Sequence, residues 1–398
     1  MISLHHSTES LCRIYGIYHF IQKYGIQINF NTESEINMVY GSSPKDIKGL
    51  NIQIAENEMQ NDISGYLKTD TEEIPLFEKP IRLNKNGESL VRFADKENEY
   101  PCVVLENNGI KIGFDIFNEV GHILAGYLEH FWKSSENEQL AKIPVVDYYE
   151  KILFDCFILA SKKLNVELEY KPFWPDGKKF AVCLTHDVDE VKKTYQYITH
   201  PLRYIKRGDF RGVLNQISSL MQKIKGAEPY WTFEKIMEIE KRHNVKSTFF
   251  FLNEKGKVNL FDPNSWKLYG RRYDINSPQV STVIKKLNSE GWEIGVHGSY
   301  YSYLDLKMLE KEKGELEKIL KSKIHGTRQH HLNLDIPETW RYHEKVGFEY
   351  DTSLGFRDKT GFRWGTCFPF NPFDSKKKRV YTFDRDTSNN NGRSVVFK

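Results

Sequence analysis

The chain has 398 residues, of which 39% are hydrophobic and 14% aromatic, so it is long enough and apolar enough to form two domains with hydrophobic cores. Its 57 Lys and Arg residues nearly balance its 54 Asp and Glu residues, and the net charge of +3 does not favour nucleic acid as a partner. Its five cysteines are scattered, with no CxxC pair, which argues against a disulfide framework and against a thiolate zinc site.

The sequence also bears on location. No apolar run approaches the roughly 20 residues that a membrane span needs, so we predict no transmembrane segment. The N-terminal stretch MISLHHSTESLCRIYG lacks the basic segment followed by an apolar segment that is typical of a signal peptide. We therefore expect a cytoplasmic protein. The sequence leaves its oligomeric state open.

Residues 1–170 have the pattern of a small α+β domain. Helical periodicity at 11–24 is followed by several short β-like runs and then by helical segments at 118–132 and 146–164. No motif in this part indicates a chemistry, so its role stays unassigned. The turn-forming cluster FWPDG at 173–177 marks the expected boundary, with a second domain at 171–398.

From residue 180 onward, strand patterns alternate with helix patterns. The expected strands are 180–184, 247–252, 292–296, 324–328 and 348–351. The helix before the third strand is well marked, with Ser277 as cap, Pro278 in its first turn and Gly291 after its end. Such alternation predicts parallel strands with right-handed crossovers. A doubly wound sheet and a barrel both fit. The positions of the polar motifs favour a (β/α) barrel of fewer than eight regular units, preceded by the smaller α+β domain.

Two acidic residues follow the first of these strands. Phe180–Leu184 reads as a strand buried on both faces, and Asp187 and Asp189 come next. In an extended backbone, residues i and i+2 point the same way, so both carboxylates face one spot. Two like charges held close need a cation or an Arg to hold them. The plainer interpretation is a polar loop after a buried strand.

Polar side chains also follow the later strands. The carboxyl ends of parallel barrel strands carry the functional groups, and here these positions hold Asn253, His297, Arg328 with His330, and Asp351. So regular a placement of polar residues after apolar strands indicates one shared site.

The segment Thr185-His186-Asp187-Val188-Asp189 resembles the first motif of the polysaccharide deacetylases, the NodB-homology domain of carbohydrate esterase family 4. The resemblance implies that Asp187 is the catalytic base. It also implies that Asp189 is a metal ligand, in place of the family's Asp at the position that Val188 occupies here. The segment EIGVHGS at 293–299 resembles the second motif, which makes His297 a metal ligand and leaves Tyr301 where the family has a second His.

Two later segments extend the resemblance. GTRQHH at 326–331 resembles the third motif, whose Arg orients the base, so Arg328 is expected to pair with Asp187. YDTSLGF at 350–356 resembles the fourth motif, whose Asp supports the groove, which places Asp351 with the catalytic residues. The family's late Leu-x-His motif has no counterpart, because no histidine follows His343. The general acid is therefore unassigned, and we expect residues 375–398 to be a poorly ordered or truncated tail.

The resemblance also implies a divalent metal as cofactor, and we expect Zn²⁺, which takes three protein ligands in catalytic sites and leaves a position for water. Asp189 and His297 supply two ligands. Tyr301 is a poor third, since a neutral phenol has a pKa near 10. If the chain stays extended past Arg328, residue 330 shares the face of Arg328 and residue 331 points away, so we predict His330 as the third ligand.

Three further residues are candidates for binding the substrate. Trp364 could stack on a sugar, although a core position is an equally good interpretation. Tyr301 follows the second motif, and Asp274 lies in a loop after the second strand, where it could reach a pocket.

The resemblance implies a metal-dependent hydrolase that removes the N-acetyl group of a carbohydrate, with an acetamido-sugar of a glycan-assembly pathway as the substrate class. The alternative is a catalytically degenerate barrel that binds a glycan or a protein partner. The missing second His and the missing late His favour that alternative.

Overall fold

The structure is a computed structural model. It describes residues 2–396 except 31, 33, 42–46, 84–86, 134–136, 195, 257, 260, 263–264, 266–267, 270–271, 375 and 382–394. The described residues form two compact units, one of residues 2–181 with 354–381 and 395–396, and the other of residues 182–353. This grouping differs from the expected domains 1–170 and 171–398, because the chain returns to the first unit after residue 353. Each unit is described by itself.

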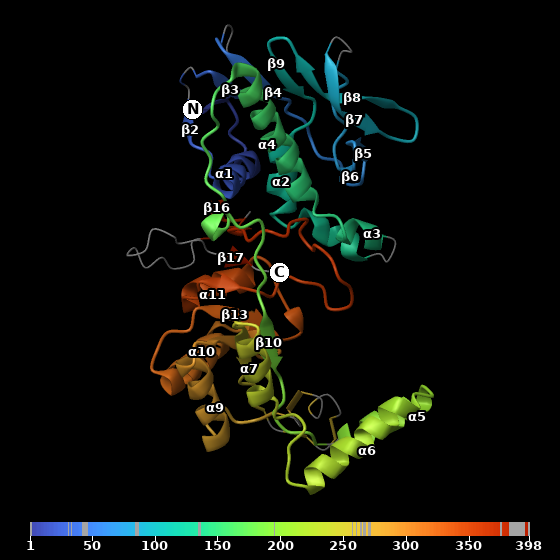
Figure 1. Ribbon diagram of the computed structural model, residues 1–398, viewed down its shortest axis with the longest axis vertical. Helices are drawn as coiled ribbons and strands as arrows, with labels where there is room; N and C mark the ends of the chain where they lie inside the picture. The colour runs from blue at the N-terminus through green and yellow to red at the C-terminus, as the bar shows by residue number, and fades with distance from the viewer. Residues whose placement is uncertain are drawn as a thin grey trace. The chain divides into compact units, whose positions relative to one another are not determined.

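A mixed sheet forms the centre of the first unit (Figure 1). Its described strands run in the order β2-β1-β3-β4-β9-β8-β7-β5-β6. In this order, the first five strands, β2, β1, β3, β4 and β9, pair in parallel. The pairs from β9 through β8, β7 and β5 to β6 are antiparallel. Their bounds are β1 Ile2–His6, β2 Ile28–Phe30, β3 Ile36–Tyr40, β4 Leu50–Ile54, β5 Gly65–Lys68, β6 Glu73–Leu76, β7 Glu88–Ala94, β8 Glu99–Glu106 and β9 Gly109–Ile112.

The helices of this unit are α1 Leu11–Tyr24, α2 Ile116–Ile123, α3 Glu138–Ala141 and α4 Val145–Leu164, with 3-10 turns η1 Tyr127–Lys133 and η3 Pro175–Gly177. Helices α1 and α2 approach so closely that glycine is required at the crossing. A Cβ on Gly121 would lie 2.0 Å from the carbonyl oxygen of Cys12, and a Cβ on Gly16 would lie 2.2 Å from that of Phe117.

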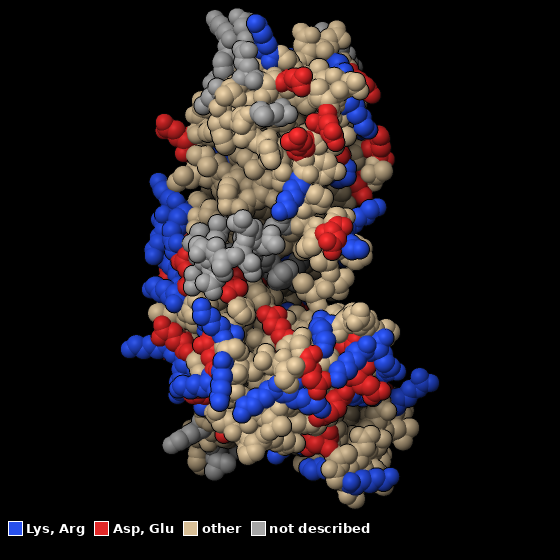
Figure 2. Space-filling model, turned by 60° about the vertical axis from the view of Figure 1, so that its left-hand side comes forward, with Lys and Arg blue, Asp and Glu red and all other residues tan. Residues whose placement is uncertain are grey.

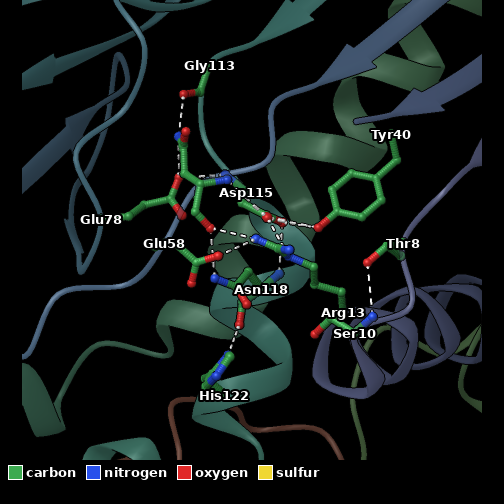
Figure 3. A network of polar contacts seen from close by, with 11 residues as sticks. Thr8, Ser10, Arg13, Tyr40, Glu58, Glu78, Gly113, Asp115, Asn118 and His122 are labelled. Carbon is green, nitrogen blue, oxygen red and sulfur yellow. Dashed lines mark hydrogen bonds and ion pairs between the residues drawn. The ribbon is translucent and has the colours of Figure 1, made fainter. Parts of the chain in front are cut away.

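Asp115 is the centre of a buried polar network at the start of α2 (Figure 3). Its Oδ1 accepts hydrogen bonds from the Tyr40 hydroxyl (2.7 Å) and from the Asn118 backbone N–H (2.9 Å), so it caps the helix. Its Oδ2 accepts from Nε of Arg13 at 3.0 Å. Glu78 in turn accepts a hydrogen bond from the backbone N–H of Asp115. The network ties α1, α2 and β3 together.

Residues 354–381 belong to the first unit because their polar contacts lie there. Trp364 donates its indole N–H to Glu129 at 2.6 Å, and Tyr15 donates its hydroxyl to the carbonyl of Asn371 at 2.6 Å. The expected poorly ordered tail is wrong for residues 376–381. Strands β15 Phe373–Asp374 and β16 Arg379–Val380 pair antiparallel, and the buried Tyr381 bonds to Asp374. Residues 382–394 lie outside the described part; β17 is Val395–Val396.

In the second unit, five parallel strands lie side by side in chain order, β10 to β14. Their bounds are β10 Thr185–Val188, β11 Thr248–Leu252, β12 Glu293–Gly298, β13 Gly326–Gln329 and β14 Tyr350–Asp351. The α/β class and the parallel strands are as predicted. The barrel is not seen, since no pairing among the described residues joins β14 back to β10.

The helices of the second unit are α5 Gln196–Lys206, α6 Phe210–Ile224, α7 Phe233–Arg242, α9 Pro278–Ser289, α10 Leu306–Leu320 and α11 Glu338–Val346, with 3-10 turns η4 Ser302–Leu304 and η5 His330–Leu332. Helix α9 begins at Pro278 and ends before Gly291, as its sequence signals indicate. Among the described helices, none is both long and apolar enough to cross a bilayer.

The core of the second unit lies between the sheet and these helices. Val296 and Phe251 from the strands pack in one buried cluster with Ile284 and Leu287 of α9. The predicted first strand is misplaced, however. Residues 180–184 are not in a strand, and Phe180 is 73% exposed, whereas β10 covers Thr185–Val188. The apolar run resembled a buried strand, but the pairing with β11 begins only at Thr185.

Candidate metal centre

The carboxyl ends of four adjacent strands bring the polar residues of the second unit to one edge of its sheet. In the register, Leu252 lies opposite His297, and His297 lies opposite Arg328. Asp187 is in β10, and Asp189 directly follows that strand. Parallel pairing in register therefore gathers side chains from four separate strand ends. Open α/β sheets generally bind ligands at this edge.

Three of these side chains converge. Oδ1 of Asp189 lies 3.2 Å from Nε2 of His297 and 3.6 Å from Nε2 of His330. One ligand atom from each of the three residues lies within 4.8 Å of the others. His297 and His330 are buried, whereas the Asp189 side chain is 46% exposed and so is open to solvent. The three form the one such group of His, Cys, Asp and Glu among the described residues.

The tautomer of His297 follows from its other nitrogen. Nδ1 lies 2.8 Å from the backbone carbonyl oxygen of Arg328, and a carbonyl can only accept, so Nδ1 carries the hydrogen. In the neutral ring, Nε2 then presents its lone pair to Oδ1 of Asp189. Two lone pairs at 3.2 Å need a cation or a proton between them. An imidazole held through Nδ1 by a backbone carbonyl is also the usual arrangement of a metal-binding His.

A buried carboxylate lies near the other ring nitrogen of His330. Its Nδ1 lies 3.9 Å from Oε2 of Glu254 and has no hydrogen bond within the described residues. Glu254 is buried; it also accepts from Arg272 and, at 2.9 Å, from the backbone N–H of Tyr300. Glu254 is thus a carboxylate near Nδ1 of His330, at a separation too long for a hydrogen bond, and Arg272 balances its charge.

The ionisation of the cluster suits metal binding. Burial raises the pKa of Asp189, but His297, His330 and Arg272 outweigh burial and lower this pKa to about 2. Burial, and next the proximity of His297, lower the pKa of His330 to about 3. At neutral pH the carboxylate is therefore ionised and the His330 imidazole neutral, which are the forms that bind metal ions.

A second group lies beside the cluster. Nη1 of Arg328 donates to Oδ1 of Asp187 and to Oγ1 of Thr185, both at 2.9 Å, and Nε donates to Oγ1 of Thr352 at 2.9 Å. The guanidinium carbon lies 4.9 Å from the ring centroid of Phe250. These contacts fix the Arg328 side chain, and Arg328 fixes the Asp187 carboxylate. Because the Asp187 side chain is 36% exposed, water can reach it.

The third predicted metal ligand, His330, lies in the cluster, although not for the reason given by strand alternation. Strand β13 ends at Gln329, and His330 begins η5. The chain then turns sharply, with φ of +58° at His331, so that His331 is exposed and its ring stacks on His330 at 4.2 Å. The turn, and not an extended strand, separates the two imidazoles.

Four other predicted site residues lie outside the Asp189–His297–His330 cluster, namely Asp351, Asp274, Trp364 and Tyr301. Asp351 is fully buried; its oxygens accept from the Trp340 indole at 3.0 Å and from the Ser353 backbone N–H at 2.9 Å, so it supports the end of β14. Asp274 is exposed and accepts from the backbone N–H of the Asn276 turn before α9.

Trp364, the candidate for sugar stacking, is 2% exposed in the first unit, so its core interpretation holds and a stacking role does not. Tyr301 is 50% exposed and its ring contacts that of Tyr300. Tyr300 itself packs against His331, with ring centroids 5.7 Å apart.

Glu254, Arg272 and Tyr273 were missed by sequence reasoning. The Tyr273 hydroxyl donates to the carbonyl of Val188 (2.7 Å) and accepts from the N–H of Leu252 (3.0 Å), so it joins the ends of β10 and β11. Glu254 lies two residues after the end of β11, a signal that could have identified it. Arg272 and Tyr273 lie about twenty residues beyond that strand, and no pattern links them to it.

Comparison with known proteins gives only distant likenesses. No family model and no curated protein matches the sequence. Among solved structures, a protein described as a polysaccharide deacetylase from Mycobacterium smegmatis is 17% identical, with 56% of this chain and 68% of that chain covered and a TM-score of 0.31. A carbohydrate deacetylase, Agd3, is 7% identical, with 95% and 69% covered and a TM-score of 0.34.

The third likeness is to BA3943, a pseudoenzyme of the CE4 family from Bacillus anthracis, at 17% identity and a TM-score of 0.21. It covers 29% of this chain, and the match spans 36% of that protein, about a third of its length. The similar structures thus include carbohydrate deacetylases and an inactive relative of them. Likenesses this distant assign no role to any residue of this chain.

Proposed function

We propose that the second unit is a metal-dependent hydrolase that removes an N-acetyl group from a carbohydrate. The observation that carries this proposal is the convergence of Asp189, His297 and His330 beside the Asp187–Arg328 pair. The order of the sequence motifs, which resembles that of the polysaccharide deacetylases, supports acetamido-sugars as the substrate class.

The donor set fits a divalent cation such as Zn²⁺. One carboxylate oxygen and two imidazole nitrogens are common ligands of catalytic zinc, and the lone pair of His297 Nε2 faces Asp189 without a hydrogen between them in the neutral tautomer. Asp189, His297 and His330 would hold the ion. When bound, such an ion supplies Lewis-acid chemistry, which acidifies water and polarises a carbonyl.

Asp187 is the proposed general base. Arg328 donates to one oxygen of Asp187, Oδ1, which keeps the carboxylate ionised and oriented. The other oxygen can then take a proton from the attacking water. The same Arg328 accepts from His297 through its backbone carbonyl, so one residue positions both the base and a metal ligand.

The test is acetate release from oligomers of N-acetylglucosamine by the purified full chain, with metal content measured in parallel. We predict that Asp187→Asn lowers the rate by at least about 100-fold, the usual range for loss of a general base, and leaves the bound metal unchanged. Asp274→Asn is the matched control, because Asp274 is an exposed carboxylate of the same unit outside the site.

Equal loss of metal in Asp187→Asn would show that the base and the ligand are assigned wrongly. A wild-type chain that binds metal and oligosaccharide yet releases no acetate would favour a binding module without catalysis.

A further inference from the structure

Helices α5 and α6 form a hairpin that extends away from the sheet of the second unit (Figure 1). Gly208, with φ of +69°, makes the turn, and Asp209 caps α6 by accepting from the N–H of Gly212 at 2.9 Å. The helices meet where Gly212 packs on Tyr204, since a Cβ on this glycine would lie 2.3 Å from the ring. The hairpin is thus a defined element with its own packing.

The apolar side chains of this hairpin face solvent. Along α6 they recur at intervals of three and four residues, and along α5 they do the same, so each helix has one apolar face. All are between 46% and 80% exposed: Ile198, Leu202, Ile205, Phe210, Leu214, Ile217, Leu220, Met221 and Ile224. Exposed apolar faces of this extent mark interaction surfaces.

The polar contacts of α6 lie on its other side, within the hairpin and the residues that lead into it. Nζ of Lys193, which is buried, donates to Oε1 of Gln216 at 2.6 Å and to Oγ of Ser219 at 2.8 Å. Nζ of Lys223 lies 4.5 Å from the ring centroid of Tyr197. With its polar side satisfied within the hairpin, the exposed apolar face of α6 is suited to contact an apolar phase.

The charge of the hairpin identifies that phase. Residues 192–227 contain eight Lys and Arg residues and one acidic residue, Asp209, whereas the whole chain is nearly balanced at 57 against 54. Figure 2 shows the two signs intermixed on the face that it presents. All the basic residues of the hairpin except Lys193 are exposed: Lys192, Arg203, Lys206, Arg207, Arg211, Lys223 and Lys225.

We propose that the α5–α6 hairpin binds the surface of a lipid bilayer that contains anionic lipids. Helices with one apolar face and a basic polar margin lie in the headgroup region, with the apolar side chains in the acyl boundary and the Lys and Arg side chains at the phosphates. A second copy of the chain fits less well, because two identical basic hairpins packed face to face would repel. The proposal is independent of the deacetylase activity.

The test is flotation of the full chain with vesicles of phosphatidylcholine alone or mixed with phosphatidylglycerol. We expect binding to the mixed vesicles only, and weaker binding as salt is raised. The double variant Leu214→Gln/Ile217→Gln should bind at least about 30-fold more weakly, because each apolar side chain loses its burial. Lys206→Gln/Arg207→Gln should also lose about 30-fold, at roughly 1 kcal/mol for each basic residue.

Ile239→Gln/Leu304→Gln is the matched control, since both residues are exposed on the same unit outside the hairpin, and it should bind like wild type. Thermal unfolding of each variant shows whether the fold is kept. The proposal is overturned if neither vesicle is bound, or if neutral and anionic vesicles are bound equally. It is also overturned if the chain dimerises without vesicles and Leu214→Gln/Ile217→Gln makes it monomeric.

Discussion

Two carboxylates, Asp115 in the first unit and Asp189 in the second, lie in contrasting surroundings. Asp115 accepts hydrogen bonds on both oxygens, from Tyr40 and Asn118 on one and from Arg13 on the other. Asp189 faces the Nε2 atoms of two imidazoles, and its Oδ1 has no hydrogen-bond partner within the described residues. A carboxylate saturated with donors stabilises a fold, whereas one that faces lone pairs is suited to hold a cation.

The pKa values of the two acids are shifted in opposite directions. Burial raises the pKa of Asp115, and its donors only partly offset this effect. Burial also raises the pKa of Asp189, but the neighbouring His297, His330 and Arg272 lower it to about 2. Asp115 is thus enclosed in a neutralising network, and Asp189 is held ionised at an open edge.

The largest expected effect is a loss of stability, which should differ between variants of the two acids. Asp115→Ala leaves the guanidinium of Arg13 without its buried partner, and we predict a loss of roughly 3–5 kcal/mol in the stability of the first unit. Asp189→Ala, measured with a chelator present, should cost the second unit less, at most about 2 kcal/mol, because the stability that its lowered pKa represents is screened by solvent at a partly exposed side chain. Hydrogen exchange of amides in α2 and β12 measures the two effects separately.

The control for that pair is Glu97→Ala, which removes an exposed carboxylate of the first unit. Equal destabilisation by the Asp115 and Asp189 variants would remove the distinction between a structural acid and a ligand.

The next effect concerns metal binding by the two adjacent histidines. His330→Ala should weaken Zn²⁺ binding by at least about 100-fold, more than the 10–100-fold typical of residues that only support a ligand. His331→Ala should leave the affinity nearly unchanged, because its ring stacks outside the cluster. Calorimetric titration with Zn²⁺ compares them. The reverse result would mean that the turn at His331 places the other ring at the metal.

A third effect lies in the network of the first unit and depends on pH. Burial raises the pKa of Glu78 to about 8. Since the folded state then holds this proton more tightly than the unfolded state, the contribution of Glu78 to stability is fully present below its ordinary pKa and is lost as the pH rises through about 8. Glu78→Gln should flatten this dependence, which has a slope of at most about 1.4 kcal/mol per pH unit. Urea unfolding at several pH values measures it, and an unchanged slope in Glu78→Gln would contradict the assignment.

Much of the second unit could be predicted from its sequence, because periodicity and strand ends are local signals. The apolar face of α9, the parallel strands and the strand-end positions of Asp189 and His297 all follow from such signals. The first strand was misplaced because an apolar run does not say where pairing begins. The barrel was expected from motif positions alone, which cannot distinguish a closed sheet from an open one.

Long-range contacts could not be predicted in the same way. Trp364 follows the fourth motif by only a few residues, yet it packs in the first unit and bonds to Glu129. Arg272 bonds to Glu254, although no sequence pattern links the two residues. Both depend on where the chain turns in space, and neighbouring residues in the sequence do not determine that.

The measurement that tests the central claim most directly is the amount of divalent metal bound by the full chain. We predict about one Zn²⁺ per chain for the wild type and for Asp187→Asn, and almost none for His297→Ala, because three protein ligands are the usual set of a catalytic zinc site. A wild-type chain that binds no divalent metal, or a His297→Ala chain that binds as much as wild type, would contradict the assignment of this cluster as a metal centre.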